Sequence, residues 1–194
     1  MTGQGRGVDH VIAPLDAPHA RVVTQLSVDL ATALSLDREV VAPSPPHITI
    51  ASYSGLEPAR VAGVLGPVAG TARPFTVRAH GYGVFTGDAD SDLSLYVVVV
   101  RTRAFDELHR RIQAALSAEG ACLAGTTDPS VWTPHITLLD RGLTPRLLGD
   151  AIEVLARRPH RTWSITVASL GVARRQADVG AEWMPVAFGT LPPM

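Results

Sequence analysis

The run PHITI at residues 46–50 returns almost unchanged as PHITL at residues 134–138. Isoleucine and threonine favour β-strands, and proline fits at the start of a strand, where no ladder hydrogen bond is needed. Each run therefore predicts a strand that follows a proline. Side chains two positions apart in a strand lie on one face. Each histidine thus shares a face with a threonine, while the aliphatic side chains point into a core.

A similar series of elements surrounds the two runs. Apolar residues that recur every three or four positions indicate helices, and short runs rich in β-branched residues indicate strands. We expect strands at residues 8–15, 47–53, 74–85, 93–101, 134–139, 162–173 and 183–189, and helices at residues 18–36, 57–69, 104–118 and 144–157. Thr144 is a candidate N-cap of the last helix, because Pro145 suits a first helical turn.

This order predicts an α+β fold that is bilobal, with two pseudo-symmetric lobes whose antiparallel sheets line a central cleft and whose helices lie outside. No low-complexity linker divides the chain, so we expect residues 1–194 to form a single domain, with residues 1–7 as a loose N-terminal tail. If an approximate twofold axis relates the lobes, the two histidine-threonine faces meet across the cleft.

The composition is that of a globular protein without an evident basic surface. The chain has 194 residues, 46% hydrophobic residues and a formal net charge of −1. Proteins that grip long nucleic acids usually carry a basic surplus, so the charge favours a small substrate over a long nucleic acid. We expect a monomer. The chain shows no signal peptide and no apolar segment long enough for a membrane, and its single cysteine favours a cytoplasmic protein. We expect Cys122 to be a buried small hydrophobic residue.

Two histidines on facing strands suit attack on a phosphodiester. Displacement at phosphorus needs a base at the nucleophile and an acid at the leaving oxygen, and histidine can act as either because its ordinary pKa is about 6.5. We predict His47 and His135 as the catalytic residues, and the assignment of base and acid stays open. The hydroxyls of Thr49 and Thr137 can donate to the non-bridging phosphate oxygens. No metal and no other cofactor is required.

The runs His47-Ile-Thr49-Ile and His135-Ile-Thr137-Leu match the two H-x-[ST]-hydrophobic motifs of the two-histidine (2H) phosphoesterase superfamily. From about residue 8 to residue 189 the chain resembles this group, which includes bacterial 2'-5' RNA ligase-like proteins and cyclic nucleotide phosphodiesterases. The resemblance implies a bilobal α+β fold around a cleft, catalysis without a metal, and substrates such as 2',3'-cyclic phosphates, ADP-ribose cyclic phosphate or 2'-5' linkages. It also implies that the two histidines and two threonines carry the chemistry.

Three further residues near the motifs are candidates, each with two interpretations. Many ligase-like members have an arginine in a run like HITLAR, whereas here the run is HITLLDR and Arg141 comes one position later. By strand parity Arg141 lies on the face of His135 and contacts phosphate, or else it is a solvated strand end. Tyr53 shares the parity of His47 and either stacks on a base or is a partly buried edge aromatic. Trp132 either covers the substrate and stacks on its base or, the favoured interpretation, packs in the core.

We therefore predict a metal-independent phosphodiesterase for 2',3'-cyclic phosphate or 2'-5'-linked nucleotide and RNA-end substrates. Two alternatives stay open. One is a nucleotide- or RNA-end-binding accessory protein of the same fold without turnover, and the other is a phosphodiesterase for a small substrate that is not RNA. The sequence leaves the base preference and the choice between hydrolase and ligase activity undecided.

Overall fold

The computed structural model describes residues 8–36, 45–86, 93–158, 162–174 and 182–189, and the predicted tail at residues 1–7 lies outside them. The elements follow in the order β1 (Asp9–Pro14), α1 (Ala17–Ala33), β2 (His47–Ser54), α2 (Pro58–Thr71), β3 (Phe75–Phe85), β4 (Leu93–Val99), α3 (Arg103–Ala118), β5 (Cys122–Leu123), the 3-10 helix η2 (Gly125–Thr127), β6 (His135–Leu143), α4 (Pro145–Ala156), β7 (Trp163–Val167), β8 (Ser169–Arg174) and β9 (Glu182–Ala187).

The described strands form two sheets. One has the strand order β5-β2-β1-β8-β9, and the other has the order β6-β4-β3-β7. All neighbouring strands pair antiparallel, so the predicted α+β class with antiparallel sheets is confirmed. The first H-x-T strand, β2, belongs to the five-stranded sheet, and the second, β6, is an edge strand of the four-stranded sheet.

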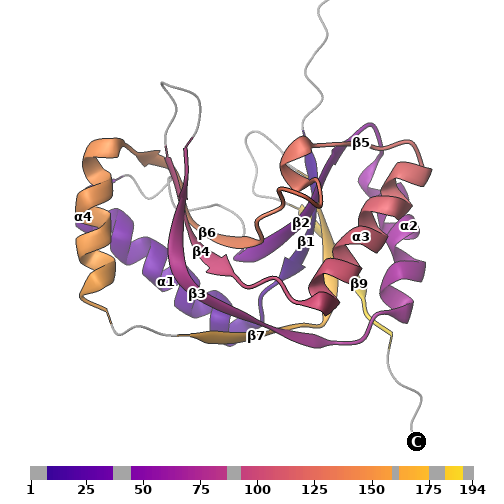
Figure 1. The fold of residues 1–194 in the computed structure, drawn as a ribbon, viewed down its shortest axis with the longest axis horizontal. Coiled ribbons are helices and arrows are strands. Elements are labelled where there is room, and N and C mark those ends of the chain that lie inside the picture. Colours follow the sequence, from indigo (N-terminus) through magenta and orange to yellow (C-terminus); the bar gives the residue numbers. More distant parts are fainter. Residues whose placement is uncertain (1–7, 37–44, 87–92, 159–161, 175–181, 190–194) are drawn as a thin grey trace, which may run out of the picture.

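Each sheet is covered by a helix that starts from the other sheet. Helix α1 follows β1 of the five-stranded sheet but lies against β6, while α3 follows β4 of the four-stranded sheet but lies against β2. Helix α2 packs beside α3 and against β8 and β9, and α4 packs beside α1. In Figure 1 α4 and α1 lie on the left and α2 and α3 on the right, and α1 runs behind β3 toward the middle. The prediction of outer helices is confirmed, and the exchange of α1 and α3 ties the two lobes together.

Local sequence signals fix where the helices begin. The side chains of Asp16, Thr102 and Thr144 accept hydrogen bonds from backbone N–H groups in the first turns of α1, α3 and α4. Such caps satisfy donors that have no partner inside the helix. The predicted cap Thr144 is thereby confirmed. In the described part of the chain, no helix is both long and apolar enough to cross a membrane.

The last strands differ from the prediction. We expected one strand at residues 162–173, but β7 pairs with β3 in the four-stranded sheet and β8 pairs with β1 and β9 in the five-stranded sheet. The buried positions are Ile165 and Val167 in β7 and then Leu170 and Val172 in β8. Their alternation shifts by one residue at the step between the sheets, because the chain enters a second sheet with a new inner face.

The prediction for Cys122 is also wrong. Its side chain is exposed, because it lies on β5, a short edge strand that pairs with the end of β2. The run GACLAG offers no nearby histidine or base, which favoured a buried cysteine over a reactive one, but Cys122 lies at a sheet edge.

Candidate active site

Strands β2 and β6 lie against each other where the two sheets adjoin. Both strands show the predicted alternation: His47 and Thr49 are half-buried, and so are His135 and Thr137, whereas the aliphatic residues beside them are buried. The structure therefore brings the two motif strands together and gives each histidine the face of its threonine.

The two histidine rings are held in the same way. The distance from Nδ1 of His47 to the carbonyl oxygen of Pro45 is 2.9 Å, and that from Nδ1 of His135 to the carbonyl oxygen of Thr133 is 2.8 Å. A carbonyl oxygen only accepts hydrogen bonds, so each Nδ1 carries a hydrogen and donates it. The lone pair of each neutral ring is then on Nε2. Both imidazoles thus present Nε2 as the atom that takes or gives a proton.

The pKa values of both histidines lie below the ordinary value. Burial is the largest cause in each case, and the hydrogen bonds to Pro45 and Thr133 act in the opposite direction. For His47 the positive charge of His135 lowers the pKa further. The carboxylate of Asp140 raises the pKa of both rings, although the net shift of each remains downward. The two rings and this carboxylate therefore lie within electrostatic reach of one another.

Each H-x-T strand contains a register shift immediately after its threonine. The pairing of β2 with β1 passes over Ile50, and the pairing of β6 with β4 passes over Leu138. An extra residue of this kind is a β-bulge, and beyond it the alternation of faces is reversed. Predictions that relied on unbroken strand parity therefore fail beyond the motifs.

The first bulge overturns the prediction for Tyr53. Its side chain is only 1% exposed and belongs to the hydrophobic core. It is not available to stack on a base, and it is not a partly buried edge aromatic either. The extra residue Ile50 is an ordinary strand residue, so no local pattern indicated the bulge.

The second bulge removes the basis for the prediction about Arg141. Its backbone belongs to β6, but its side chain lies outside what the structure describes, so a phosphate contact stays a prediction. Sequence reasoning missed Asp140, the residue before it. The Oγ of Ser94 donates to Oδ1 of Asp140 at 3.2 Å, and Asp140 is exposed. Within the described ranges, histidine, cysteine, aspartate and glutamate side chains form no group of three or more that could hold a metal ion.

Trp132 packs in the core and links the two motifs. Its side chain is 3% exposed, and its ring stacks on that of His109 at 3.9 Å between centroids. Its Nε1 donates to the carbonyl oxygen of Thr49 at 3.1 Å. Arg101 donates to the carbonyl oxygen of Trp132 at 3.1 Å and lies over its ring. The favoured packing interpretation is confirmed, and a ring so covered cannot stack on a substrate base.

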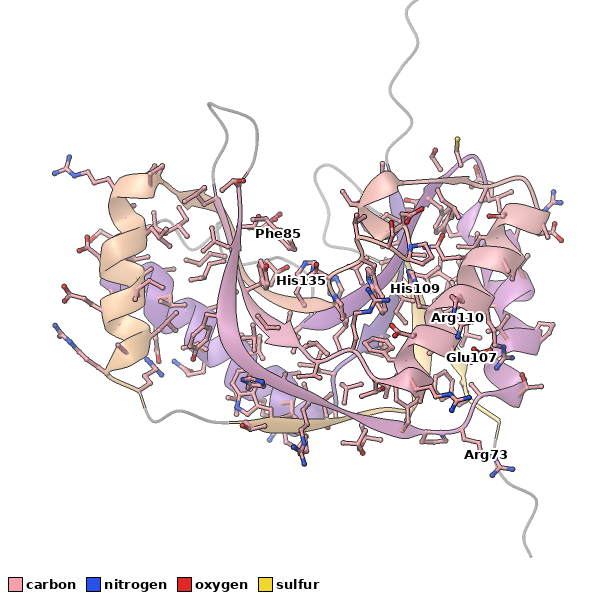
Figure 2. All side chains as sticks on the ribbon, viewed as in Figure 1. Arg73, Phe85, Glu107, His109, Arg110 and His135 are labelled. Atoms are coloured by element: carbon pink, nitrogen blue, oxygen red, sulfur yellow. The ribbon has the colours of Figure 1, made fainter. Side chains whose placement is uncertain are left out.

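An aromatic pair that sequence reasoning missed lies beside His135. The ring centroid of Phe85 is 4.8 Å from that of His135, and the centroid of Tyr96 is 5.0 Å from it. Figure 2 shows Phe85 and His135 next to each other between the lobes. Tyr96 lies opposite Thr137 in the register of β4 and β6. Both aromatics stand in strands predicted correctly, but only the pairing of the strands shows that they adjoin the histidine.

A family model described as the 2'-5' RNA ligase superfamily matches residues 14–179, which include both motifs. The chain belongs to this superfamily. Its members are 2H phosphoesterases, so phosphodiester hydrolysis or transfer is supported at the level of the family. A search of curated protein sequences found no significant match.

Solved structures with the same fold include three that cover nearly the whole chain. The protein TT0787 of Thermus thermophilus is 14% identical, with 93% of this chain and 95% of that chain covered and a TM-score of 0.62. A protein described as a phosphoesterase is 19% identical, with 95% and 99% covered and a TM-score of 0.59. E. coli LigT complexed with 3'-AMP is 15% identical, with 95% and 99% covered and a TM-score of 0.58. At these identities the likeness shows the fold.

Proposed function

We propose that this protein is a metal-independent phosphodiesterase that opens 2',3'-cyclic phosphates or cleaves 2'-5' linkages of nucleotides and RNA ends. The observation that carries the proposal is the matched pair of histidines. Each ring donates Nδ1–H to a carbonyl oxygen two residues earlier and presents Nε2 for proton transfer. Two such rings can supply the one base and the one acid that displacement at phosphorus needs.

The reaction on a cyclic phosphate proceeds by attack of water on phosphorus. Nε2 of one neutral histidine takes a proton from the water as the new P–O bond forms. The bond from phosphorus to one ribose oxygen breaks, and Nε2–H of the other, protonated histidine supplies a proton to that oxygen. The products are a ribose hydroxyl and a phosphomonoester, and exchange of one proton with solvent at each ring restores the pair.

Thr49 and Thr137 have the complementary role at the non-bridging oxygens. Each threonine is two residues from its histidine and half-buried like it. A hydroxyl on the same strand face can donate to the oxygens where negative charge accumulates during displacement. A related fold supports a nucleotide substrate, because E. coli LigT has been solved in complex with 3'-AMP.

The experiment is a turnover assay with EDTA present throughout. The substrates are the four nucleoside 2',3'-cyclic phosphates, ADP-ribose cyclic phosphate and a 2'-5'-linked oligoadenylate, with products separated by chromatography. We expect turnover of at least one substrate by the wild type and none by the His47→Ala/His135→Ala double variant. Each single variant should lose at least about 100-fold in kcat, since one proton transfer contributes about 10²–10⁴-fold.

The control variant is His80→Ala, which removes an exposed histidine of β3 outside the motifs and should leave turnover unchanged. Near-normal activity of either motif variant would contradict the two-histidine mechanism. Failure of the wild type to act on every substrate would contradict the proposed substrate class.

A further inference from the structure

Phe85 offers an exposed aromatic surface next to His135. Its side chain is 37% exposed, and its ring meets that of His135 at an angle of 76°. Aromatic rings are the usual stacking surface for unpaired bases, and this ring has an exposed part that a base can contact. With the phosphate at the histidines, the base of the same nucleotide lies within reach of this ring.

The ring of Phe85 is supported by the ring of Tyr96. The two rings stack, with 4.2 Å between centroids and 27° between planes. Tyr96 in turn lies over Gly83, where an added Cβ would come within 2.5 Å of the tyrosine ring. Glycine at this position therefore lets the tyrosine lie flat against β3. The result is a supported aromatic platform rather than a single mobile side chain.

A carboxylate lies on the same sheet as the platform, across β4 from Phe85. Ser94 lies opposite Phe85 in the register of β3 and β4, and its Oγ donates to Oδ1 of Asp140 across to β6. Phe85 and Asp140 are therefore both neighbours of Ser94 on the four-stranded sheet. The side chain of Asp140 is exposed, and its orientation is set by the serine.

A carboxylate beside a stacking surface discriminates among bases. An ionised carboxylate only accepts hydrogen bonds. Guanine presents two adjacent donors, N1–H and the exocyclic amine, on its Watson–Crick edge, and both can bind one carboxylate. Adenine and cytosine present one amine beside a ring nitrogen that is an acceptor, and uracil presents one N–H between two carbonyl oxygens. A carboxylate oxygen placed next to an acceptor of the base is unfavourable, so guanine fits best.

We propose that Phe85 and Asp140 form a base-binding subsite that selects guanine next to the catalytic histidines. The inference rests on the proposed function and names its base preference. Phe85 stacks on the base, and Asp140 accepts hydrogen bonds from N1–H and the exocyclic amine.

The test compares kcat/KM for the four nucleoside 2',3'-cyclic phosphates in the wild type, Asp140→Asn and Phe85→Leu. We expect the wild type to prefer the guanosine substrate over the uridine substrate by about 10- to 100-fold, as for hydrogen bonds to a charged group. Asp140→Asn should reduce this ratio below about threefold. Phe85→Leu should raise KM for all four substrates, because every base has a face that stacks.

The ratio of kcat/KM between two substrates that differ only in the base measures recognition of the base separately from proton transfer. The charge of Asp140 also acts on both histidines, so Asp140→Asn will change the rate for all four substrates, but by the same factor. Glu107→Gln is the matched control, since it removes one exposed carboxylate of α3 (Figure 2) and should keep the wild-type ratio.

The outcomes separate this inference from the proposed function. Turnover of all four substrates at similar kcat/KM would overturn the guanine subsite and leave the phosphodiesterase intact. If no substrate is turned over, calorimetric binding of guanosine and uridine 3'-monophosphates decides the subsite. Tighter binding of the guanosine compound, lost in Asp140→Asn, supports the inference, and equal or absent binding refutes it.

Discussion

Trp132 is the residue whose replacement best tests how the fold holds the two motifs together. Its indole N–H donates to the carbonyl oxygen of Thr49 in the first motif, while its own backbone leads into the second. Trp132→Phe removes the donor and keeps an aromatic ring in the same place. The substitution therefore cuts the side-chain hydrogen bond by which Trp132 joins β2.

The expected loss can be worked out from these contacts. A lost hydrogen bond costs about 0.5–1.5 kcal/mol. The smaller ring also gives up part of its stacking on His109 and its contact with Arg101, which adds about 1–2 kcal/mol by comparison with other reductions of core side chains. The sum is about 1.5–3.5 kcal/mol out of a total stability of about 5–15 kcal/mol. For a chain of this size that lowers Tm by roughly 3–14 °C.

The assay is thermal unfolding followed by circular dichroism, together with kcat on the substrate that the panel identifies. We expect kcat to fall at least about tenfold at a temperature where the variant is folded, because small displacements of catalytic groups are costly. Trp163→Phe is the control, since Trp163 is half-buried in β7 and lies opposite Ala79 of β3 rather than on a motif strand. Equal, small losses of Tm in both variants with unchanged kcat would refute the reasoning.

Three other predictions follow from the site and the core. The pKa values of His47 and His135 are lowered, mainly by burial, so the bell-shaped pH profile of kcat/KM should have its maximum below about pH 6.5. The profile is measured from pH 4 to 9, and a maximum above pH 7 would contradict this prediction. Gly83→Ala should displace the Tyr96 ring, since the new Cβ would lie 2.5 Å from it, and cost about 1–3 kcal/mol in urea unfolding; wild-type stability and KM would show that the ring has room. Burial also lowers the pKa of His109, so its unfolded form binds a proton below about pH 6.5 while the folded form does not, and stability should fall as the pH decreases through that range. Urea unfolding at pH 7.5 and 5.5 should show a smaller decrease in His109→Gln than in the wild type, and an equal decrease would exclude His109 as a cause.

The environment of His109 explains the sign of that last prediction. The side chain is fully buried, and its Nε2 donates to the carbonyl oxygen of Thr127 at 3.0 Å. Its Nδ1 is buried and, among the residues that the structure describes, has no hydrogen-bond partner. A proton added at Nδ1 would place a charge in the core next to Trp132 without an acceptor, so the neutral ring is the stable form.

The order of the elements was predictable because it depends on local periodicity. Alternation within a strand put each histidine and threonine on one face, and spacings of three and four residues indicated the helical stripes. The repeat of PHIT indicated that the two halves of the chain are similar lobes. The same local reasoning failed where the alternation changed phase, at Ile50, at Leu138 and between β7 and β8.

The sequence by itself thus determined the α+β class, the order of most elements and the two H-x-T faces, since all of these follow from patterns within a few neighbouring residues. The tertiary structure decided which side chains adjoin the histidines. Phe85, Asp140 and Trp132 reach the site through the pairing of β3, β4 and β6 and through a hydrogen bond to β2. Register between strands that are distant in the chain depends on packing and bulges, and no short stretch of sequence contains that information.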